Sequence, residues 1–256
     1  MNMLFIEAGE AGLALGRGDP RRKHIRSVLK KGPGDELAAG RADGRLGVAR
    51  IEADDEDGMT LSFAPGPEAP PLRPVTLLLG FPRPIQANRI LKDLASLGVA
   101  RIMLSGTELG EKSYFQSDFF KNREFRSALI EGAEQAGNPR LPVVETAWTL
   151  ARALDAIVPE ADDAARDDAA RDGASRFWAF DPYRAERPFG SVALSDSGPE
   201  RPLVLAIGSE RGWTDAELDL LSASGFPFAS LGDRILKTET ACVVAVAMAL
   251  GKLGYI

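Results

Sequence analysis

Five prolines between Ala64 and Pro74 divide this chain of 256 residues into two regions of different pattern. Proline fixes its own backbone φ angle and has no N–H donor, so the segment can form neither a helix interior nor a central strand. We predict that it is a stiff linker between two domains, residues 1–70 and 71–256. Each region is therefore interpreted separately.

The region before the linker has the pattern of a small β-rich module. Turn signals at Gly34–Leu37 and Asp43–Leu46 separate short runs, and residues 47–51 and 59–63 alternate as strands do. The segment from Arg17 to Lys31 contains seven lysines and arginines and one acid, Asp19, although the chain has a net charge of −6. This segment is either a phosphate-binding patch or a solvated basic face.

Strands alternate with helices after the linker. Runs of strand composition are 75–79, 100–104, 143–144, 177–180, 203–207 and 228–231. Helical patterns cover 85–97, 118–136, 148–157 and 215–222, and Gly98 is a C-cap signal. This alternation predicts an α/β fold with a parallel sheet, in which ligands bind beyond the carboxyl ends of the strands.

Two glycine-containing loops follow predicted strands near the end of the chain. The first is Ile207–Trp213, and the second is Leu231–Thr240. The first lacks both the Walker and the dinucleotide-binding spacing, and a capping box at Thr214 and Glu217 follows it. The loops predict one small-molecule pocket built largely from main chain. The segment 241–250 is apolar on every side of a helix, so we expect it to be buried all round, in the core or at a subunit interface.

Residue types that are scarce exclude several classes of site. The chain has one cysteine, Cys242, and one histidine, His24, so an internal disulfide is impossible and zinc chemistry is disfavoured. A serine–histidine–acid triad would require His24, which lies in the basic segment. Residues 160–175 are of low complexity, which is typical of a solvated helix or a disordered insertion rather than a metal site. No run is long enough to cross a bilayer and no signal peptide is recognisable, so we expect a cytoplasmic protein without a membrane partner.

Four segments, taken in order, resemble the SPOUT-type small-subunit ribosomal RNA uracil-N3 methyltransferases. Residues 24–30 with Gly34-Asp35-Glu36 are similar to the family's His-x-x-x-Val-Leu-Arg and Gly-Asp start, and 131–137 to its Glu-Ala-Ala-Glu-Gln-Ser-Gly helix end. Residues 207–213 resemble its Ile-Gly-Pro-Glu-Gly-Gly-Phe loop. The longest and most specific match is 231–241, which is similar to Leu-Gly-x-Arg-Ile-Leu-Arg-Thr-Glu-Thr-Ala.

The resemblance implies a PUA-like RNA-binding β-barrel, a C-terminal α/β domain with a deep trefoil knot, and a homodimer that acts on ribosomal RNA or the small ribosomal subunit. It also implies the cofactor S-adenosylmethionine, held by three loops. The implied cofactor residues are Phe180, Asp181, Ile207, Gly208, Ser209, Glu210, Gly212, Leu231, Gly232, Arg234, Ile235 and Leu236. The candidate RNA-binding residues are Arg21, Arg22, Lys23, His24, Arg26, Lys30 and Lys31.

Methylation of uracil N3 requires loss of a proton or stabilisation of the charge that develops on the ring. Arg234 and Lys237 are candidates for stabilising this charge or for positioning a phosphate, and they could equally be surface cations. Glu239 and Glu210 are candidate proton acceptors, and either could instead cap backbone amides. We thus take Arg234, Lys237 and Glu239 as the candidate catalytic residues.

The sequence departs from the family pattern at several positions. Ser209 replaces a proline, and Arg211 replaces a glycine of the cofactor loop, where its side chain could narrow the loop or offer a cation to the substrate. The family's Lys-Ala-Thr-Glu-Leu-Gly helix end is Asp93–Gly98 here, without the lysine and the glutamate, and its Glu-Arg-Ser segment has no clear counterpart in 106–110. Three alternatives therefore stay open: another RNA target, a non-catalytic RNA-binding protein with a degenerate pocket, or an enzyme that uses a different nucleotide cofactor.

Overall fold

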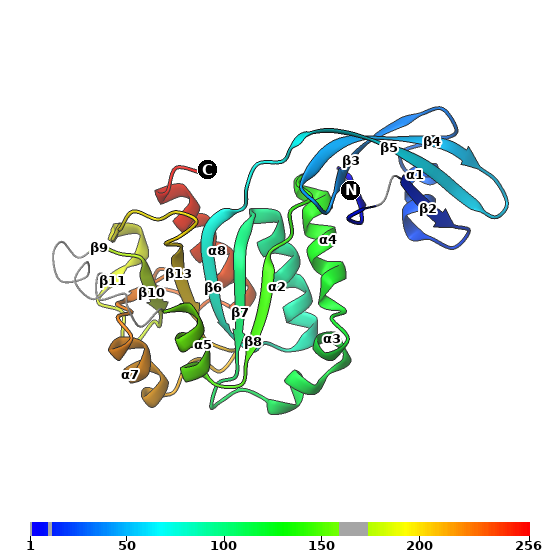
Figure 1. Ribbon diagram of the computed structural model, residues 1–256. Helices are drawn as coiled ribbons and strands as arrows, with labels where there is room; N and C mark the ends of the chain where they lie inside the picture. The colour runs from blue at the N-terminus through cyan, green and yellow to red at the C-terminus, as the bar shows by residue number, and fades with distance from the viewer. Residues whose placement is uncertain (1, 10–11, 159–173) are drawn as a thin grey trace. The chain divides into compact units, whose positions relative to one another are not determined.

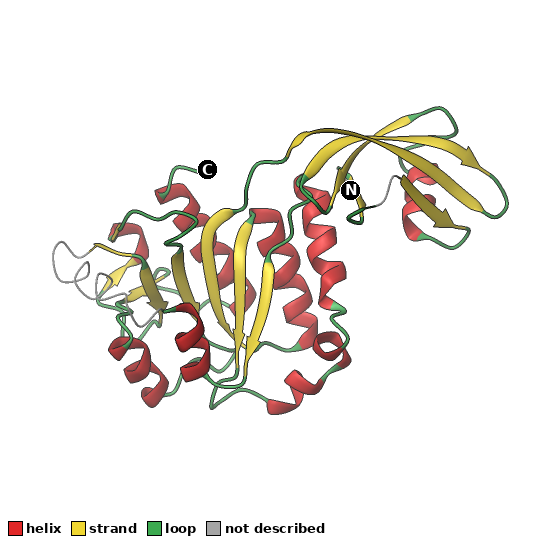
Figure 2. Cartoon of the chain, viewed as in Figure 1, coloured by secondary structure: helices red, strands yellow, loops and turns green. Residues whose placement is uncertain are grey.

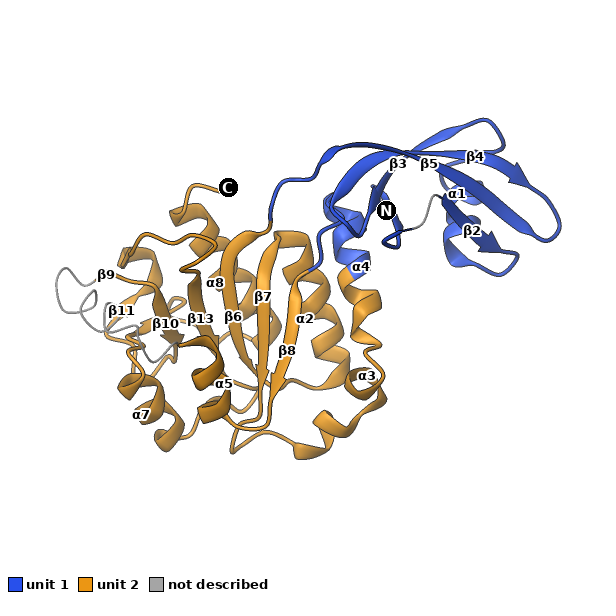
Figure 3. Ribbon diagram, viewed as in Figure 1, with its two compact units in different colours: residues 1–71, 130–141 blue, residues 72–129, 142–256 orange. Residues whose placement is uncertain are grey.

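The structure, a computed structural model, describes residues 2–9, 12–158 and 174–256. It contains two compact units, one of residues 1–71 with 130–141 and one of residues 72–129 with 142–256 (Figure 3). The first unit thus includes 130–141, a segment that the sequence-based division at residue 70 left in the second region. The low-complexity segment 160–175 falls almost entirely outside the described residues.

The proline-rich segment is only in part a linker. Residues 64–68 complete the long strand β5 (Gly58–Glu68), in which Pro65 lies opposite Gly47 of β4 (Arg45–Asp54). Residues 58–62 of β5 pair with β2 (Gly12–Gly16), whereas residues 64–68 lie beyond the end of β2 and have β4 as their neighbour. A sheet edge tolerates proline because no ladder partner needs the missing N–H. The expectation that the whole segment lies outside the sheet was therefore wrong for residues 64–68.

In its described residues, the first unit is a barrel-like sheet of five strands with the helix α1 and the segment 130–141. The sheet order is β1-β3-β4-β5-β2, and only the β1–β3 pair is parallel. The remaining elements are β1 (Leu4–Ile6), β3 (Glu36–Arg41) and α1 (Pro20–Ser27). Helix α1 begins after the N-cap Asp19, has Pro20 in its first turn, and buries Ile25 in the core of the unit with Leu4, Ile51 and Met59.

Residues 130–141 are bonded to the start of the chain. The Glu134 carbonyl accepts from the backbone N–H groups of Asn2 and Met3, and Glu134 Oε1 accepts from Phe5 N at 3.1 Å. Asn138 Nδ2 donates to the Pro70 carbonyl at 3.0 Å. These bonds link segments far apart in sequence, which explains why local pattern did not assign 130–141 to the first unit.

The second unit is built on a seven-stranded sheet of order β11-β14-β10-β13-β6-β7-β8, in which every pair is parallel (Figures 1 and 2). This confirms the predicted α/β fold with a parallel sheet. Its strands are β6 (Arg73–Gly80), β7 (Val99–Ser105), β8 (Val143–Ala147), β10 (Phe177–Phe180), β11 (Arg187–Pro188), β13 (Leu203–Ile207) and β14 (Phe228–Ser230). A short separate pair joins β9 (Ala174–Ser175) and β12 (Ala193–Leu194).

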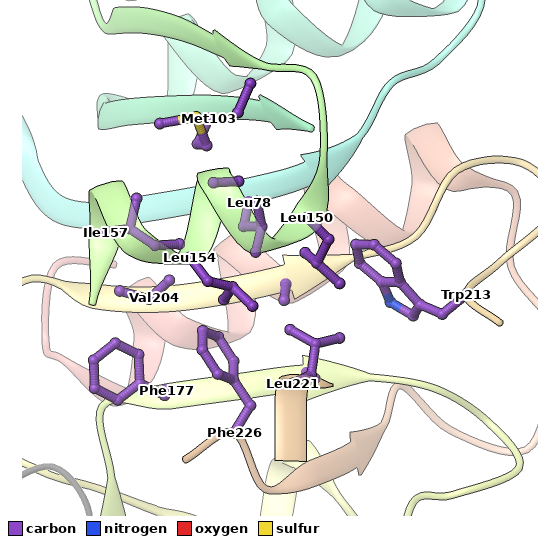
Figure 4. Packing of buried hydrophobic residues seen from close by; sticks show 14 of the residues in the cluster. Leu78, Met103, Leu150, Leu154, Ile157, Phe177, Val204, Trp213, Leu221 and Phe226 are labelled. Carbon is purple, nitrogen blue, oxygen red and sulfur yellow. The ribbon is translucent and has the colours of Figure 1, made fainter. Parts of the chain in front are cut away.

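Helices cover both faces of this sheet. They are α2 (Pro84–Leu97), α3 (Asp118–Lys121), α4 (Phe125–Ala136, which continues into the first unit), α5 (Leu150–Ile157), α7 (Asp215–Ala223) and α8 (Thr238–Lys252), with 3₁₀ turns η1 (Lys112–Gln116) and η2 (Phe189–Ser191). Along β13, Val204 and Ala206 join a cluster with α5 and α7 (Figure 4), so Leu203, Leu205 and Ile207 face the side of α8. The near-continuous burial of β13 follows from this double cover.

One helix expectation was wrong in detail. The helix expected over 118–136 is interrupted at 122–124, where Arg123 adopts a left-handed φ of 54°, so α3 and α4 are separate. Helix α8, which we expect to be buried in the core or at a subunit interface, is buried along one face within a single chain. Cys242, Ala245, Val246, Ala249 and Leu250 are buried, whereas the opposite stripe of Val243, Val244, Ala247 and Met248 is half-buried.

Candidate functional site

Three loops of the second unit lie at neighbouring strand ends. They follow β10, β13 and β14, and β10 lies between the other two in the sheet. Because all three strands are parallel, their carboxyl ends share one edge, which is the usual place for a ligand in such sheets. The predicted loops after Phe180, Ile207 and Ser230 therefore come together in space.

These loops enclose a cavity with a volume of about 320 Å³, which we call the loop cavity. All twelve predicted cofactor residues line it: Phe180, Asp181, Ile207, Gly208, Ser209, Glu210, Gly212, Leu231, Gly232, Arg234, Ile235 and Leu236. Four further lining residues, Pro182, Arg211, Trp213 and Thr238, belong to the loops predicted from the sequence. Sequence reasoning did not assign the additional lining residues Tyr183, Ala229, Ser230 and Ala241. Most of these additional residues continue the same three loops, which is the signal that could have found them.

The loop after β13 is held by close backbone packing. Gly212 has a φ of 76°, and its N–H donates to the Ser209 carbonyl at 2.9 Å. A Cβ on Gly208 would lie 2.9 Å from the Gly212 carbonyl carbon, and a Cβ on Gly80 would overlap the Ser209 nitrogen. Glycine at 208 and 80 thus permits an approach that a side chain would prevent. Ser209 is buried, and its Oγ lies 3.4 Å from Thr107 Oγ1.

Trp213 joins the loop cavity to the core. Its indole packs in the cluster of α5 and α7, as Figure 4 shows, and also lines the cavity. Its Nε1 is buried and has no hydrogen-bond partner among the described residues. The predicted capping box follows, with Glu217 N donating to Thr214 Oγ1 at 3.2 Å and Thr214 N donating to Glu217 Oε2 at 2.9 Å. A rigid helix start thus fixes one wall of the cavity.

Asp181 uses its carboxylate to shape the loop after β10. Asp181 Oδ1 accepts from Tyr183 N at 2.9 Å and from Arg184 N at 2.8 Å, and the residue is buried. These bonds form a local turn of the type that aspartate favours. Asp181 therefore positions main chain at the cavity wall.

A second and larger cleft, of about 800 Å³, adjoins the loop cavity and shares Glu210, Leu236 and Thr238 with it. We call it the outer cleft. Its remaining lining residues are Arg83, Pro84, Ile85, Gln86, Arg89, Tyr114, Lys237 and Glu239. Sequence reasoning identified Lys237 and Glu239 but missed the contribution of α2 and η1, because no pattern in those segments indicates a site.

The two candidate proton acceptors differ in their bonding. Glu210 Oε1 accepts from Arg83 N at 2.9 Å, so this carboxylate caps the start of α2. Glu239 lies in the first turn of α8, its side chain is 20% exposed, and its Oε1 is 3.9 Å from Arg89 Nη1. Glu239 Oε2 is buried without a partner among the described residues, and so is Gln86 Oε1 of the same cleft. A buried acceptor without a donor favours a ligand that brings one.

The two candidate cations lie on different cavities. Arg234 is exposed and lines the loop cavity, and it has no hydrogen bond or ion pair among the described residues. Lys237 is the exposed N-cap residue of α8 and lines the outer cleft. Arg234, Lys237 and Glu239 thus lie on two cavities that adjoin, whereas His24 belongs to the first unit.

The basic segment of the first unit is not uniformly available to a ligand. Arg22 is 5% exposed, pairs with Asp54 at 2.6 Å and also donates to the Asp55 carbonyl. We therefore correct its assignment from RNA-binding residue to structural residue. Arg26 lies 3.3 Å from the same Asp54, and Arg21 pairs with Asp19 at 2.7 Å. Lys23 and Lys30 are exposed, and His24 and Lys31 are half-buried.

No group of three or more His, Cys, Asp or Glu side chains in the described part of the chain is placed to hold a metal ion. Cys242 is buried in α8, and burial raises the pKa of its thiol. None of the described helices combines the length and the hydrophobicity required to span a membrane.

Comparison with known proteins gives consistent similarities. Residues 68–250 match the family model described as RNA methyltransferase domain. The chain is 37% identical over 254 residues to the ribosomal RNA small subunit methyltransferase E of Treponema pallidum, covering 98% of this chain and 91% of that protein. It is 28% identical to the ribosomal RNA small subunit methyltransferase E 1 of Borreliella burgdorferi, covering 99% of each.

Solved structures share the fold. A ribosomal RNA small subunit methyltransferase E from Neisseria gonorrhoeae, bound to S-adenosyl methionine, superposes with a TM-score of 0.71 at 22% identity over 98% of each chain. A methyltransferase from Legionella pneumophila, in complex with the same cofactor, gives a TM-score of 0.72 at 23% identity, again over 98% of each chain.

Proposed function

The chain belongs to the RNA methyltransferase family, and from this premise we propose that it transfers a methyl group from S-adenosylmethionine to N3 of a uracil in small-subunit ribosomal RNA. The relatives with 37% and 28% identity bear the name of small-subunit ribosomal RNA methyltransferases and are matched over nearly their whole length. The observation that carries the proposal is the pair of adjoining cavities at the carboxyl edge of the sheet.

The loop cavity fits the proposed cofactor in size and chemistry. Its volume of about 320 Å³ is within the range of roughly 300–1,000 Å³ for small-molecule sites. Apolar side chains such as Phe180, Ile207 and Leu236 offer walls for an adenine ring, and the loops around Gly208 and Gly232 expose main-chain groups for hydrogen bonds. The buried Trp213 Nε1 provides a donor that has no partner among the described residues. When bound, the cofactor supplies a methyl group on a sulfonium, so no metal is needed.

The residues of the outer cleft account for the remaining chemistry. Uracil N3 carries a proton and becomes nucleophilic when that proton leaves. In our proposal Glu239 Oε2 accepts the proton, because this buried oxygen has no hydrogen-bond partner among the described residues and suits an N–H donor. Glu210, by contrast, already accepts a hydrogen bond from Arg83 N. Lys237 and Arg234 stabilise the negative charge that develops on the ring oxygens, or hold the phosphate of the nucleotide.

The first unit provides the proposed contact to RNA phosphates. The set consists of Arg21, Lys23, His24, Arg26, Lys30 and Lys31, after removal of the buried Arg22. Such contacts position an RNA without reading its sequence. We further propose that the first unit is PUA-like, that the second contains a deep trefoil knot, and that the protein is a cytoplasmic homodimer. The half-buried apolar stripe of α8 supports the homodimer.

The experiment that tests the cofactor site is calorimetric titration with S-adenosylmethionine and S-adenosylhomocysteine. We expect micromolar binding by the wild type and at least tenfold weaker binding by Gly232→Ala, because Gly232 has a φ of 112° and lines the loop cavity. The matched control is Gly98→Ala. Gly98 is also left-handed, with a φ of 78°, but it caps α2 at the opposite edge of the sheet, so the control should lose stability and keep cofactor affinity.

The RNA target is tested by mass spectrometry of small-subunit ribosomal RNA incubated with protein and cofactor. One methyl group on N3 of a uracil supports the proposal, and a methyl group on another atom or RNA supports the alternative target. If the folded protein binds neither cofactor form, with or without RNA, the proposal is wrong, and a non-catalytic RNA-binding protein is favoured.

A further inference from the structure

Three aromatic rings form a continuous stack at the carboxyl edge of the large sheet. Phe81, which follows β6, stacks on Phe115 of η1 with a centroid distance of 3.9 Å and an interplanar angle of 24°. Phe115 stacks in turn on Trp148, which follows β8, at 4.5 Å and 15°. The inner ring is anchored in the core, because Phe81 is 2% exposed and also contacts the Phe120 ring at 4.2 Å.

The outer ring of this stack is open to solvent. Trp148 is 59% exposed, whereas Trp178 and Trp213 are 2% and 7% exposed. Tryptophan is on average a highly buried residue and is enriched at interfaces, so an exposed indole that stacks on an anchored ring is a candidate interaction surface. The backbone of Trp148 is fixed as well. Gly106 N donates to the Ala147 carbonyl at 2.8 Å, and a Cβ on Gly106 would overlap the Trp148 carbonyl oxygen.

The stack and the outer cleft share two segments of the chain. The segment after β6 gives Phe81 to the stack and Arg83 to the cleft, and η1 gives Phe115 to the stack and Tyr114 to the cleft. Both lie at the edge of the sheet where the cofactor loops lie, since every strand pair of that sheet is parallel. A ligand that fills the outer cleft and extends along this edge reaches the rings.

The chemistry of the proposed reaction requires such a surface. N3 lies on the Watson–Crick edge of uracil, so its methylation requires a nucleotide that is unpaired and taken out of its stack. The nucleotide next to the target then loses a stacking partner. Aromatic side chains replace that partner in single-stranded RNA complexes, and they accept any base because every base has a π face.

We propose that the exposed face of Trp148 stacks on a nucleobase of single-stranded RNA next to the target nucleotide. This inference rests on the proposed function, and it assigns a binding role to a residue that takes no part in methyl transfer. The geometry favours RNA over an aliphatic partner, because the surface offered is one flat ring at the end of an ordered stack, with the exposed cation Arg83 on an adjoining segment.

The test is binding of a short, labelled, single-stranded RNA of ten nucleotides containing uracil to the full-length protein. Trp148→Ala should weaken binding between about 5-fold and 150-fold. Trp148→Phe should recover part of the affinity. Because the other two tryptophans are buried, RNA should also quench the exposed-tryptophan fluorescence of the wild type, and this quenching should be absent in both variants.

Two controls separate this inference from folding and from the proposed function. Val143→Ala removes an exposed apolar side chain at the opposite end of β8 and should leave RNA affinity unchanged. Calorimetry with S-adenosylmethionine should give the wild-type affinity for Trp148→Ala, which shows that the loop cavity is intact. If the wild type binds cofactor and RNA but Trp148→Ala binds RNA equally well, the stacking proposal alone is overturned.

A change in oligomeric state would also overturn the proposal. If Trp148→Ala dissociates an oligomer without a loss of RNA affinity, the Trp148 ring contacts a second copy of the chain and not a nucleobase. If the wild type binds no cofactor but Trp148→Ala still weakens RNA binding, the stacking site stands and the methyl-transfer proposal fails.

Discussion

At the residue scale, Glu239 is the most direct test of the proposed proton transfer. Glutamine has nearly the same shape as glutamate but is a much weaker base, so Glu239→Gln should lower the rate of methyl transfer by about 10²–10⁴-fold. Cofactor affinity should change little, because Glu239 lines the outer cleft and not the loop cavity. The measurement is single-turnover methylation of RNA.

Glu210→Gln is the matched control for this prediction. Glu210 also lines the outer cleft, but its Oε1 accepts from Arg83 N, and a glutamine Oε1 can accept the same bond. We expect less than about a tenfold change in rate for this variant. Wild-type turnover by Glu239→Gln would remove Glu239 from the mechanism and leave charge stabilisation by Arg234 and Lys237 as the remaining contribution.

Glu134 gives a stability prediction at the same scale. Burial raises the pKa of this carboxyl, although the Phe5 N–H bonded to Oε1 opposes the shift. The folded state therefore holds the proton to higher pH than the unfolded state does. The stability that the protonated Glu134 carboxyl contributes is fully present below the pKa it has in the unfolded chain. This stability is lost as the pH rises through the pKa of the same carboxyl in the folded state.

Glu134→Gln should therefore flatten the decline of stability with rising pH above about 4.5 and should leave the protein at least as stable as the wild type at neutral pH. The glutamine oxygen can still accept from Phe5 N. Urea unfolding followed between pH 4 and pH 8 measures the effect. A variant that is less stable at neutral pH, with an unchanged slope, would show that the ionised carboxylate is favourable in the folded state.

At the element scale, α1 tests the proposed phosphate contacts. Lys23→Ala with Lys30→Ala removes two exposed cations of the segment that carries α1. If both contact phosphates, the slope of log affinity against log salt should fall by about 1.4–1.8, since each contact contributes roughly 0.7–0.9. The measurement is RNA binding across a series of salt concentrations.

Arg22→Met is the contrasting variant in the same helix. Arg22 is buried against Asp54, so its loss should destabilise the first unit and leave the salt slope unchanged for protein that is still folded. If the double lysine variant keeps the wild-type slope, the basic segment is only a solvated surface.

The elements also show which parts of the fold local sequence determines. Each strand, glycine turn and helix start around Gly208 and Gly232 could be predicted, because the turn requires glycine and the flanking runs have clear periods. The sequence analysis assigned Pro65 and Pro67 to a linker, but both lie in β5. Proline is compatible with a strand where no neighbouring strand needs its N–H, and local sequence does not show which strands are neighbours. The interruption at Arg123 was missed because no glycine or proline indicates it, and the left-handed residue there is an arginine.

At the scale of the whole molecule, the loop cavity could be predicted and the outer cleft could not. The loop cavity is formed by consecutive main chain after parallel strands, so identifying the strands identifies its walls. The outer cleft combines α2, η1 and α8, and the ring stack combines three segments of the chain. Nothing in the local composition near Arg83, Tyr114 or Trp148 shows that these segments meet.

The proposed homodimer is the last prediction, and it concerns the apolar stripe of α8. Val243, Val244, Ala247 and Met248 are half-buried in one chain, and covering such a stripe with a second copy removes apolar surface from water. Light scattering should give a mass near twice 27.4 kDa for the wild type. Val244→Lys with Met248→Lys should shift that mass towards the monomer, because a dimer would bury the two charges without partners.

A matched substitution tests whether a change in mass is specific to the apolar stripe of α8 or follows from any loss of exposed apolar surface. Val143→Lys places the same charge on an exposed apolar residue outside α8, and it should leave the mass at the dimer value. Far-ultraviolet circular dichroism of each variant identifies any loss of folding. A folded double variant that stays dimeric would exclude this stripe as the interface, and a monomeric wild type would reject the homodimer itself. In that second case, the residues described for one chain would have to form the complete site for both cofactor and RNA.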